Sequence, residues 1–147
     1  MNILVLNGPN LNLLGTREPE IYGNITLEDI NNNLINNYPE INITFKQSNS
    51  ESELITWVGD APKNFSGILI NPAALTHTSL GLYDAIKAIS NKIPVIEIHL
   101  SNTYSREEIR HKSLTAGACV GQIMGFKENS YDLGMNAIIK ILDTSNR

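Results

Sequence analysis

Two residues that could transfer protons stand two positions apart in an otherwise apolar segment of this chain. Glu97 and His99 lie in residues 94–99, a run typical of a buried β-strand, so their side chains project from one face. A carboxylate that accepts from one ring nitrogen fixes the imidazole tautomer and prepares the ring to carry a proton. The spacing predicts an acid–base pair, and a purely structural Glu–His pair is the alternative.

Other polar residues follow the other apolar segments. Asn10 comes soon after residues 3–6, and Asn71 and His77 follow residues 67–70. His77 stands just before a predicted helix N-terminus, where it could donate to a hydroxyl group of a ligand. The alternative is that these are ordinary turn and solvated loop residues.

Leu100 and Ser101 follow the Glu97–His99 segment and offer backbone N–H groups and a hydroxyl. Arg106 and Arg110 are four positions apart on a predicted helical turn, so both guanidinium groups can point the same way. Together these residues predict a wall that binds a carboxylate or hydroxyl groups. The alternative is a solvated face on which these arginines pair with neighbouring glutamates.

The loop at about 15–23 is long for a connection between a strand and a helix, and Gly15 and Gly23 bracket it. Such a loop is typical of an active-site lid, with a decorated surface loop as the alternative. It contains Arg17 and Tyr22. A phenol with a pKa of about 10 acts as a base at pH 7 only where a cation lowers that pKa, and Arg17 could supply the cation.

Composition narrows the classes of function. The chain has 147 residues, and 11 Lys+Arg against 15 Asp+Glu give 11 − 15 = −4, which offers no basic surface for nucleic acid. The length predicts one domain over residues 1–147. No apolar run approaches the roughly 20 residues of a membrane span, and no secretory signal is visible, so we expect a cytoplasmic protein. Cys119 has no cysteine partner in the sequence.

Apolar runs alternate with segments of helical period along the whole chain. We expect strands at 3–6, 41–45, 67–70, 94–99 and 118–124, and helices at 26–38, 50–61, 78–90 and over the C-terminal segment. This alternation predicts a parallel sheet covered on both faces, which is a three-layer α/β/α sandwich. Because the carboxyl ends of parallel strands meet at one edge, the candidate residues should converge there.

Several kinds of chemistry have no support in the sequence. The histidines lack the spacing of metal ligands, and the first strand is followed by neither a P-loop nor a dinucleotide fingerprint. There is no Gly-x-Ser-x-Gly nucleophile motif. We therefore expect acid–base chemistry without a metal or a cofactor. A tyrosinate base and an imidazole acid suit removal of a proton beside a carbonyl and protonation of a departing hydroxyl, which is a dehydration.

The sequence resembles the type II 3-dehydroquinate dehydratases over nearly its whole length. The motifs that carry the resemblance occur in order along the chain, and they are Leu6-Asn7-Gly8-Pro9-Asn10-Leu11-Asn12, Arg17-Glu18-Pro19 with Ile21-Tyr22-Gly23, Gln47-Ser48-Asn49, Asn71-Pro72-Ala73-Ala74, Thr76-His77-Thr78-Ser79 and Glu97-Ile98-His99-Leu100-Ser101-Asn102. The chain departs from the family pattern at Ser50 and Ser52, and at Lys127, where the family often has glycine.

The resemblance implies a flavodoxin-like fold with strand order 2-1-3-4-5. It also implies cofactor-free anti elimination of water from 3-dehydroquinate through an enolate to give 3-dehydroshikimate, a step of the shikimate pathway. The family forms trimers that assemble into dodecamers, so we expect a homo-oligomer. The alternative is a non-catalytic module of the same fold that binds a small hydroxy acid.

The resemblance further implies a role for each candidate residue. Tyr22 is the expected base at C2, activated by Arg17, and His99 is the expected acid for the C1 hydroxyl, oriented by Glu97. Asn10 would position a water on the enolate oxygen. The expected substrate-binding residues are Asn71, Leu100 and Ser101 for the carboxylate, His77 and Arg110 for hydroxyl groups, Arg106 near the lid, and Asp84 from a neighbouring subunit.

Overall fold

Five strands form the centre of the molecule. The computed structural model describes residues 1–16 and 18–146, with the side chain of Tyr22 left out. The strands are β1 (Asn2–Asn7), β2 (Asn42–Gln47), β3 (Gly67–Asn71), β4 (Val95–His99) and β5 (Gly121–Met124). All adjacent pairs are parallel, and the order is β2-β1-β3-β4-β5. The predicted strand order of a flavodoxin-like sheet is confirmed.

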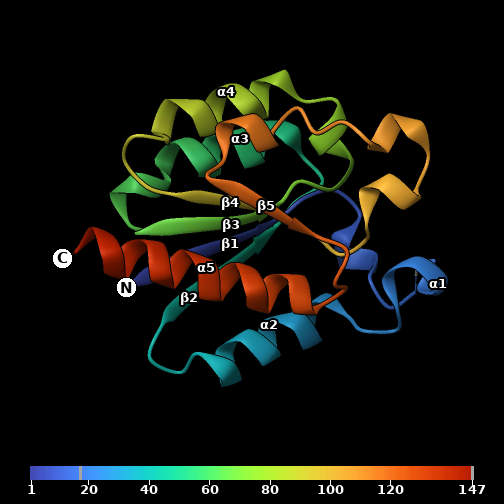
Figure 1. The fold of residues 1–147 in the computed structure, drawn as a ribbon, viewed down its shortest axis with the longest axis horizontal. Coiled ribbons are helices and arrows are strands. Elements are labelled where there is room, and N and C mark those ends of the chain that lie inside the picture. The colour runs from blue at the N-terminus through green and yellow to red at the C-terminus, as the bar shows by residue number, and fades with distance from the viewer. Residues whose placement is uncertain (17, 147) are drawn as a thin grey trace.

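Helices cover both faces of this sheet. The helices are α1 (Pro19–Tyr22), α2 (Leu27–Asn37), α3 (Glu51–Asp60), α4 (Leu80–Ile89) and α5 (Asn129–Ser145). Figure 1 shows α3 and α4 on one face and α2 and α5 on the other, which confirms the predicted three-layer sandwich. Each face has its own apolar core, because successive residues of β1, β3 and β4 alternate between the two helix layers. In the part of the chain that the structure describes, no helix is long and apolar enough to cross a membrane.

Side-chain caps start the helices close to where the sequence predicts them. Thr26 and Asp29 form a reciprocal capping box at the start of α2. Ser50 accepts from the Glu53 amide at the start of α3, and Ser79 accepts from the Leu82 amide at the start of α4. These oxygens satisfy N–H groups that have no partner inside the helix.

The two edge strands differ from the expected pattern. β1, β3 and β4 are buried on both faces as predicted, but β2 and β5 are partly exposed because each has a neighbour on one side only. β5 also begins later than the predicted residue 118, because Ala116–Ala118 form a 3-10 turn. The apolar character of residues 118–120 therefore does not mark the start of the strand.

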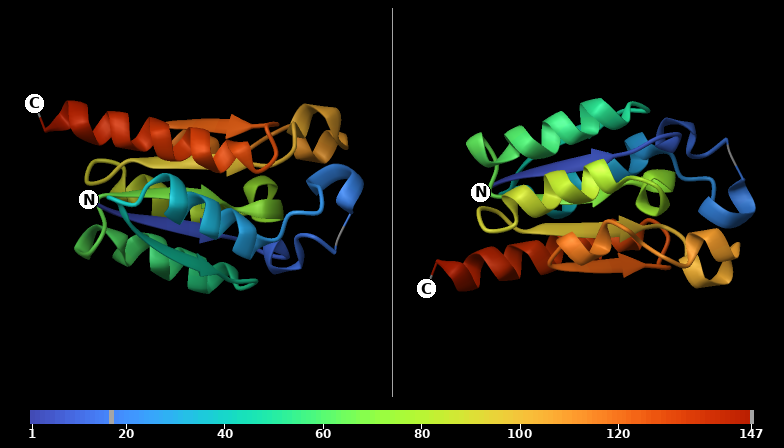
Figure 2. Two further views of the ribbon diagram at one scale, coloured as in Figure 1. Left: turned by 90° about the horizontal axis from the view of Figure 1, so that it is seen from below. Right: turned by 90° about the horizontal axis from the view of Figure 1, so that it is seen from above.

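Strand register brings the candidate residues to one edge of the sheet. Asn7 is paired with Gln47 on one side and with Asn71 on the other, at the carboxyl ends of β1, β2 and β3. Ile70 is paired with Glu97 on β4. Figure 2 shows that the short helical segments after β1 and β4 lie beyond this same edge. The loops after β1, β3 and β4 therefore converge, as the sequence analysis expects.

Lys127 adopts a left-handed backbone conformation in the turn after β5, with φ of 53°. A residue with a Cβ atom pays roughly 1–2 kcal/mol in this region, and glycine does not. We expect Lys127→Gly to raise the free energy of unfolding by about 1 kcal/mol, because relief of strain exceeds the added chain entropy of glycine. Urea unfolding of both proteins measures the difference. A destabilised Lys127→Gly variant would contradict this account, and Lys112→Gly in an exposed loop with ordinary φ is the control.

Candidate active site

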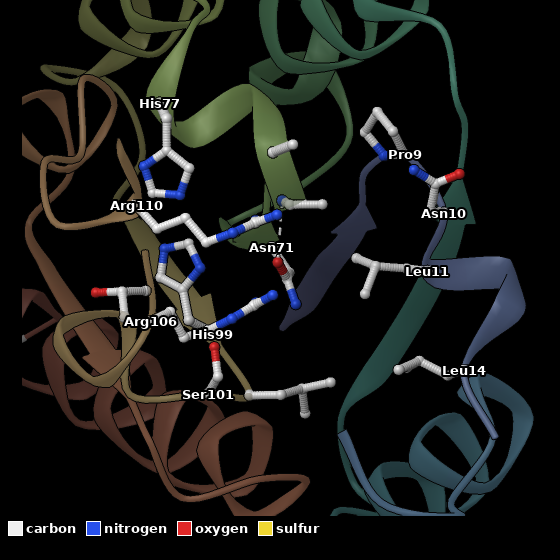
Figure 3. A pocket seen from close by; sticks show the side chains of 14 residues that line it. Pro9, Asn10, Leu11, Leu14, Asn71, His77, His99, Ser101, Arg106 and Arg110 are labelled. Atoms are coloured by element: carbon white, nitrogen blue, oxygen red, sulfur yellow. Dashed lines mark hydrogen bonds between the residues drawn. The ribbon is translucent and has the colours of Figure 1, made fainter. Parts of the chain in front are cut away.

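A pocket lies beyond the carboxyl ends of β1, β3 and β4. Figure 3 shows His77, His99, Ser101, Arg106 and Arg110 along one side and Pro9, Leu11 and Leu14 along the other, with Asn71 between them. The residues that line it are Pro9, Asn10, Leu11, Leu14, Asn71, Ala73, Ala74, His77, His99, Leu100, Ser101, Thr103, Arg106 and Arg110. The pocket thus brings together eight of the expected site residues, namely Asn10, Asn71, His77, His99, Leu100, Ser101, Arg106 and Arg110.

The Glu97–His99 pair has the predicted contact. His99 Nε2 lies 2.9 Å from Glu97 Oε2, and the Glu97 side chain is fully buried behind the imidazole. Because an ionised carboxylate only accepts hydrogen bonds, Nε2–H must be the donor. This leaves His99 Nδ1 as the nitrogen that can exchange a proton with a molecule in the pocket.

His77 has its tautomer set by the backbone. His77 Nδ1 lies 2.8 Å from the carbonyl oxygen of Lys112. A carbonyl oxygen can only accept, so Nδ1 carries the proton and Nε2 is left for a ligand. A neutral His77 therefore offers an acceptor to a hydroxyl group, whereas the sequence analysis expects it to donate.

Arg106 and Arg110 both line the pocket, but not on one helical turn as predicted. Arg106 follows the 3-10 turn Thr103–Ser105 with an extended backbone, and Arg110 is the last residue of a second 3-10 turn, Glu108–Arg110. Arg110 Nε donates to Glu107 Oε2 at 2.8 Å, and this hydrogen bond lowers the pKa of Glu107. The lining residues that the structure describes include two arginines and no carboxylate, so the pocket suits an anion.

The side chain of Asn71 is hydrogen-bonded to the buried phenol of Tyr131. Asn71 Nδ2 donates to Tyr131 Oη at 3.0 Å, Tyr131 Oη donates to Asn7 Oδ1, and Asn71 Oδ1 accepts from the Ala73 amide. Burial raises the pKa of Tyr131, so the phenol keeps its proton. Tyr131 is therefore a fixed donor under the pocket and is unsuited to act as a base.

The loop that carries Asn10 is tied to the end of β2. Asn10 has φ of 69°, a left-handed conformation that asparagine tolerates, and its amide donates to Asn49 Oδ1 at 2.9 Å. Gln47 Nε2 reaches both Asn49 Oδ1 and the Gly8 carbonyl at 3.2 Å. A Cβ atom on Gly8 would lie 2.5 Å from the Pro72 carbonyl oxygen, so the loops after β1 and β3 approach closely only because this residue is glycine.

The predicted lid contains one turn of helix that the sequence analysis did not expect. α1 occupies Pro19–Tyr22, and Gly15 and Gly23 have positive φ values of 92° and 80° on either side of it. Glu18 Oε2 lies 4.0 Å from Arg106 Nη2, so the segment approaches the pocket wall. The predictions for Arg17 and for the side chain of Tyr22 lie outside what the structure describes.

Asp84 lies apart from the other expected residues. It is exposed on α4 and does not line the pocket within the described chain. The resemblance to the family assigns Asp84 to the site of a neighbouring subunit, and this assignment stays a prediction.

Sequence reasoning did not assign several residues that build the pocket. Leu11, Leu14 and Thr103 contribute to its walls, and Asn7 and Tyr131 support Asn71 from beneath. The run of polar and apolar residues after β1 could have indicated Leu11 and Leu14. Nothing local could have indicated Tyr131, because it lies 124 positions from Asn7.

The fold and the pocket together define a class of protein. A flavodoxin-like sheet carries a cationic pocket at its carboxyl edge, and that pocket contains an imidazole backed by a buried carboxylate. Within the described residues, no three His, Cys, Asp or Glu side chains form a cluster that could hold a metal ion. Such a site can bind a small anionic molecule and exchange a proton with it.

Comparison with known proteins identifies the family. The family model described as dehydroquinase class II matches residues 1–139. A 3-dehydroquinate dehydratase of Prochlorococcus marinus (strain MIT 9515) is 53% identical over 144 residues, with 97% of each chain covered. The 3-dehydroquinate dehydratase of Carboxydothermus hydrogenoformans is 52% identical, covering 97% of this chain and 92% of the relative. The chain therefore belongs to the class II dehydroquinase family.

Solved structures agree with this assignment. The type II dehydroquinase of Butyrivibrio crossotus superposes with a TM-score of 0.89 at 43% identity, covering 94% of this chain and 97% of the other. The type II dehydroquinase of Propionibacterium acnes gives a TM-score of 0.87 at 38% identity, covering 92% and 93%. The expected family and fold are both confirmed.

Proposed function

We propose that this protein is a type II 3-dehydroquinate dehydratase of the shikimate pathway, a cofactor-free hydro-lyase. The reaction removes the C2 proton beside the C3 ketone, and the enolate then expels the C1 hydroxyl as water to leave a C1–C2 double bond. The observation that carries the proposal is the Glu97–His99 pair at the wall of a cationic pocket, in a chain of this family.

The acid and the base of this reaction are assigned to different parts of the chain. His99 acts as the imidazolium: it gives its Nδ1 proton to the departing hydroxyl and keeps the Nε2 proton that it donates to Glu97. Tyr22 removes the C2 proton as a phenolate whose charge is stabilised by Arg17. Asn10 positions a water that stabilises the enolate oxygen, and the fixed conformation of its loop supports this role.

The remaining pocket residues bind the substrate. The substrate carboxylate is bound by Asn71, Leu100 and Ser101. His77 Nε2 accepts from a ring hydroxyl, and Arg110 donates to another. Arg106 closes the site together with the lid at about 15–23, and its 4.0 Å approach to Glu18 supports this role.

We further propose that residues 1–147 act as one catalytic domain within a homo-dodecamer built from trimers. Large apolar side chains at Leu80 and Ile109 are 64% and 72% exposed, which supports their burial between subunits. In that assembly Asp84 completes the site of a neighbour. We place the enzyme in the cytoplasm. Analytical ultracentrifugation tests the assembly, and cell fractionation tests the location.

The experiment that tests the function is an ultraviolet assay for the conjugated enone after 3-dehydroquinate is added. We expect product formation, and no loss of activity when borohydride is present with the substrate. The reason is that no lysine lines the pocket in the described chain, so acid–base chemistry rather than a Schiff base is expected. Binding without enone formation would favour a hydroxy-acid-binding module. A borohydride-trapped covalent adduct would contradict the acid–base route.

A further inference from the structure

The buried carboxylate of Glu97 has two more partners, which none of the roles above uses. Ser113 Oγ lies 2.9 Å from Glu97 Oε2, and Thr115 Oγ1 is hydrogen-bonded to Glu97 Oε1. With His99 Nε2, three side-chain groups surround a carboxylate that is 0% exposed. A buried charge is costly unless it is hydrogen-bonded, so these groups explain how Glu97 is tolerated in an apolar strand.

Each hydroxyl has one proton, and its surroundings decide where that proton points. Ser113 Oγ accepts from the Ala116 amide at 2.9 Å, so its own proton is free for Glu97. Thr115 Oγ1 directs its proton to the other carboxylate oxygen. Because both hydroxyls donate to Glu97, the carboxylate acts as the acceptor for His99 Nε2–H as well.

The segment that supplies these hydroxyls also holds the second imidazole of the pocket. The Lys112 carbonyl accepts from His77 Nδ1, and the Leu114 amide donates to the Thr76 carbonyl at 2.8 Å. Residues 112–115 therefore contact His77 through the backbone and reach His99 through Glu97. Alternate side chains of this segment, Ser113 and Thr115, face the same carboxylate.

We propose that Ser113 and Thr115 are positioning residues for the proton transfer at His99. They fix both oxygens of Glu97, which keeps His99 Nε2–H donating to Glu97 and leaves Nδ1 as the nitrogen that carries the proton for the substrate. Without them the carboxylate is free to turn, and the ring loses its fixed orientation. This inference deepens the proposed function and rests on it for its kinetic consequence, although the hydrogen-bond arrangement itself needs no substrate.

Thr115→Val and Thr115→Ser are the matched variants for the kinetic test. Valine keeps the shape of threonine without the hydroxyl, and serine keeps the hydroxyl. We expect Thr115→Val to lower kcat about tenfold at unchanged KM, a part of the roughly 10²–10⁴-fold contribution of general acid catalysis. Thr115→Ser retains most of kcat. Thr56→Val, which removes an exposed hydroxyl on α3, leaves kcat unchanged.

A spectroscopic readout separates this inference from the proposed function. In the free protein, the His99 Nε2 proton shared with Glu97 should give a low-field proton NMR resonance that disappears in His99→Ala. We expect the chemical shift of this resonance to change in Thr115→Val and in Ser113→Ala, and to be unchanged in Thr56→Val. If the wild type makes no enone, the proposed function fails, but the resonance still tests the positioning.

One combination of results would contradict the positioning role of these hydroxyls. Full kcat together with an unmoved resonance in Thr115→Val would make the hydroxyl merely structural, whatever happens to Tm. Ser113→Ala provides the same test through the other carboxylate oxygen if Thr115→Val fails to fold.

Discussion

Replacement of His99 by alanine is expected to lower kcat for enone formation by about 10²–10⁴-fold, the range of a positioned general acid. The C1 hydroxyl is a poor leaving group unless it is protonated as it departs, and His99 Nδ1 is the proton donor assigned here. Removal of the C2 proton does not need His99. We therefore expect unreacted 3-dehydroquinate recovered from D2O to carry deuterium at C2, because the enolate still forms and is reprotonated.

Substrate binding and folding are the controls for this variant. The Kd for 3-dehydroquinate should change little in calorimetry, since the carboxylate contacts assigned to Asn71, Leu100 and Ser101 remain. Wild-type kcat in His99→Ala would remove His99 from the mechanism. Loss of both elimination and C2 exchange would instead make His99 part of the proton-abstraction step.

Replacement of Tyr22 by phenylalanine is expected to have an effect of the same size, about 10²–10⁴-fold on kcat, but on a different step. Phenylalanine keeps the ring and lacks the group that would accept the C2 proton. Both enone formation and C2 exchange in D2O should therefore be lost, in contrast to His99→Ala. Measurement of both quantities on the two variants assigns the base and the acid separately.

Tyr38→Phe is the matched control for Tyr22→Phe. The Tyr38 hydroxyl donates to the Asp132 carbonyl at 3.1 Å between α2 and α5, and burial raises its pKa. Its removal costs part of one hydrogen bond and leaves the pocket intact, so kcat should match the wild type. Rapid C2 exchange in Tyr22→Phe would show that another group removes the proton. Tyr131 is an unsuitable replacement because burial raises its pKa as well.

The elements of this fold were predictable because their signals are local. Thr26 with Asp29 and Ser50 with Glu53 are three residues apart, and such short spacings survive in any tertiary context. The start of β5 was not predictable in the same way. Residues 118–120 are apolar and lie in the predicted strand, but Ala116–Ala118 form a 3-10 turn that follows the two residues, Ser113 and Thr115, whose hydroxyls contact Glu97.

In the site, the contact between Glu97 and His99 was predictable from local spacing, whereas the other contacts of Glu97 were not. Two residues on one strand at spacing two must share a face, so their contact followed from sequence alone. The hydroxyls on Glu97 come from 16 and 18 positions away. Those distances carry no periodic signal, because a loop of that length can close in many ways.

By itself, the sequence determined the family, the parallel three-layer architecture, and which polar residues follow the strands. Tertiary structure alone decided which nitrogen of each imidazole is free, since the partners are the Lys112 carbonyl for His77 and a carboxylate backed by two hydroxyls for His99. It also decided that Tyr131 supports Asn71. Secondary structure follows from short-range periodicity, whereas the protonation and orientation of a buried group follow from whatever the fold packs against it.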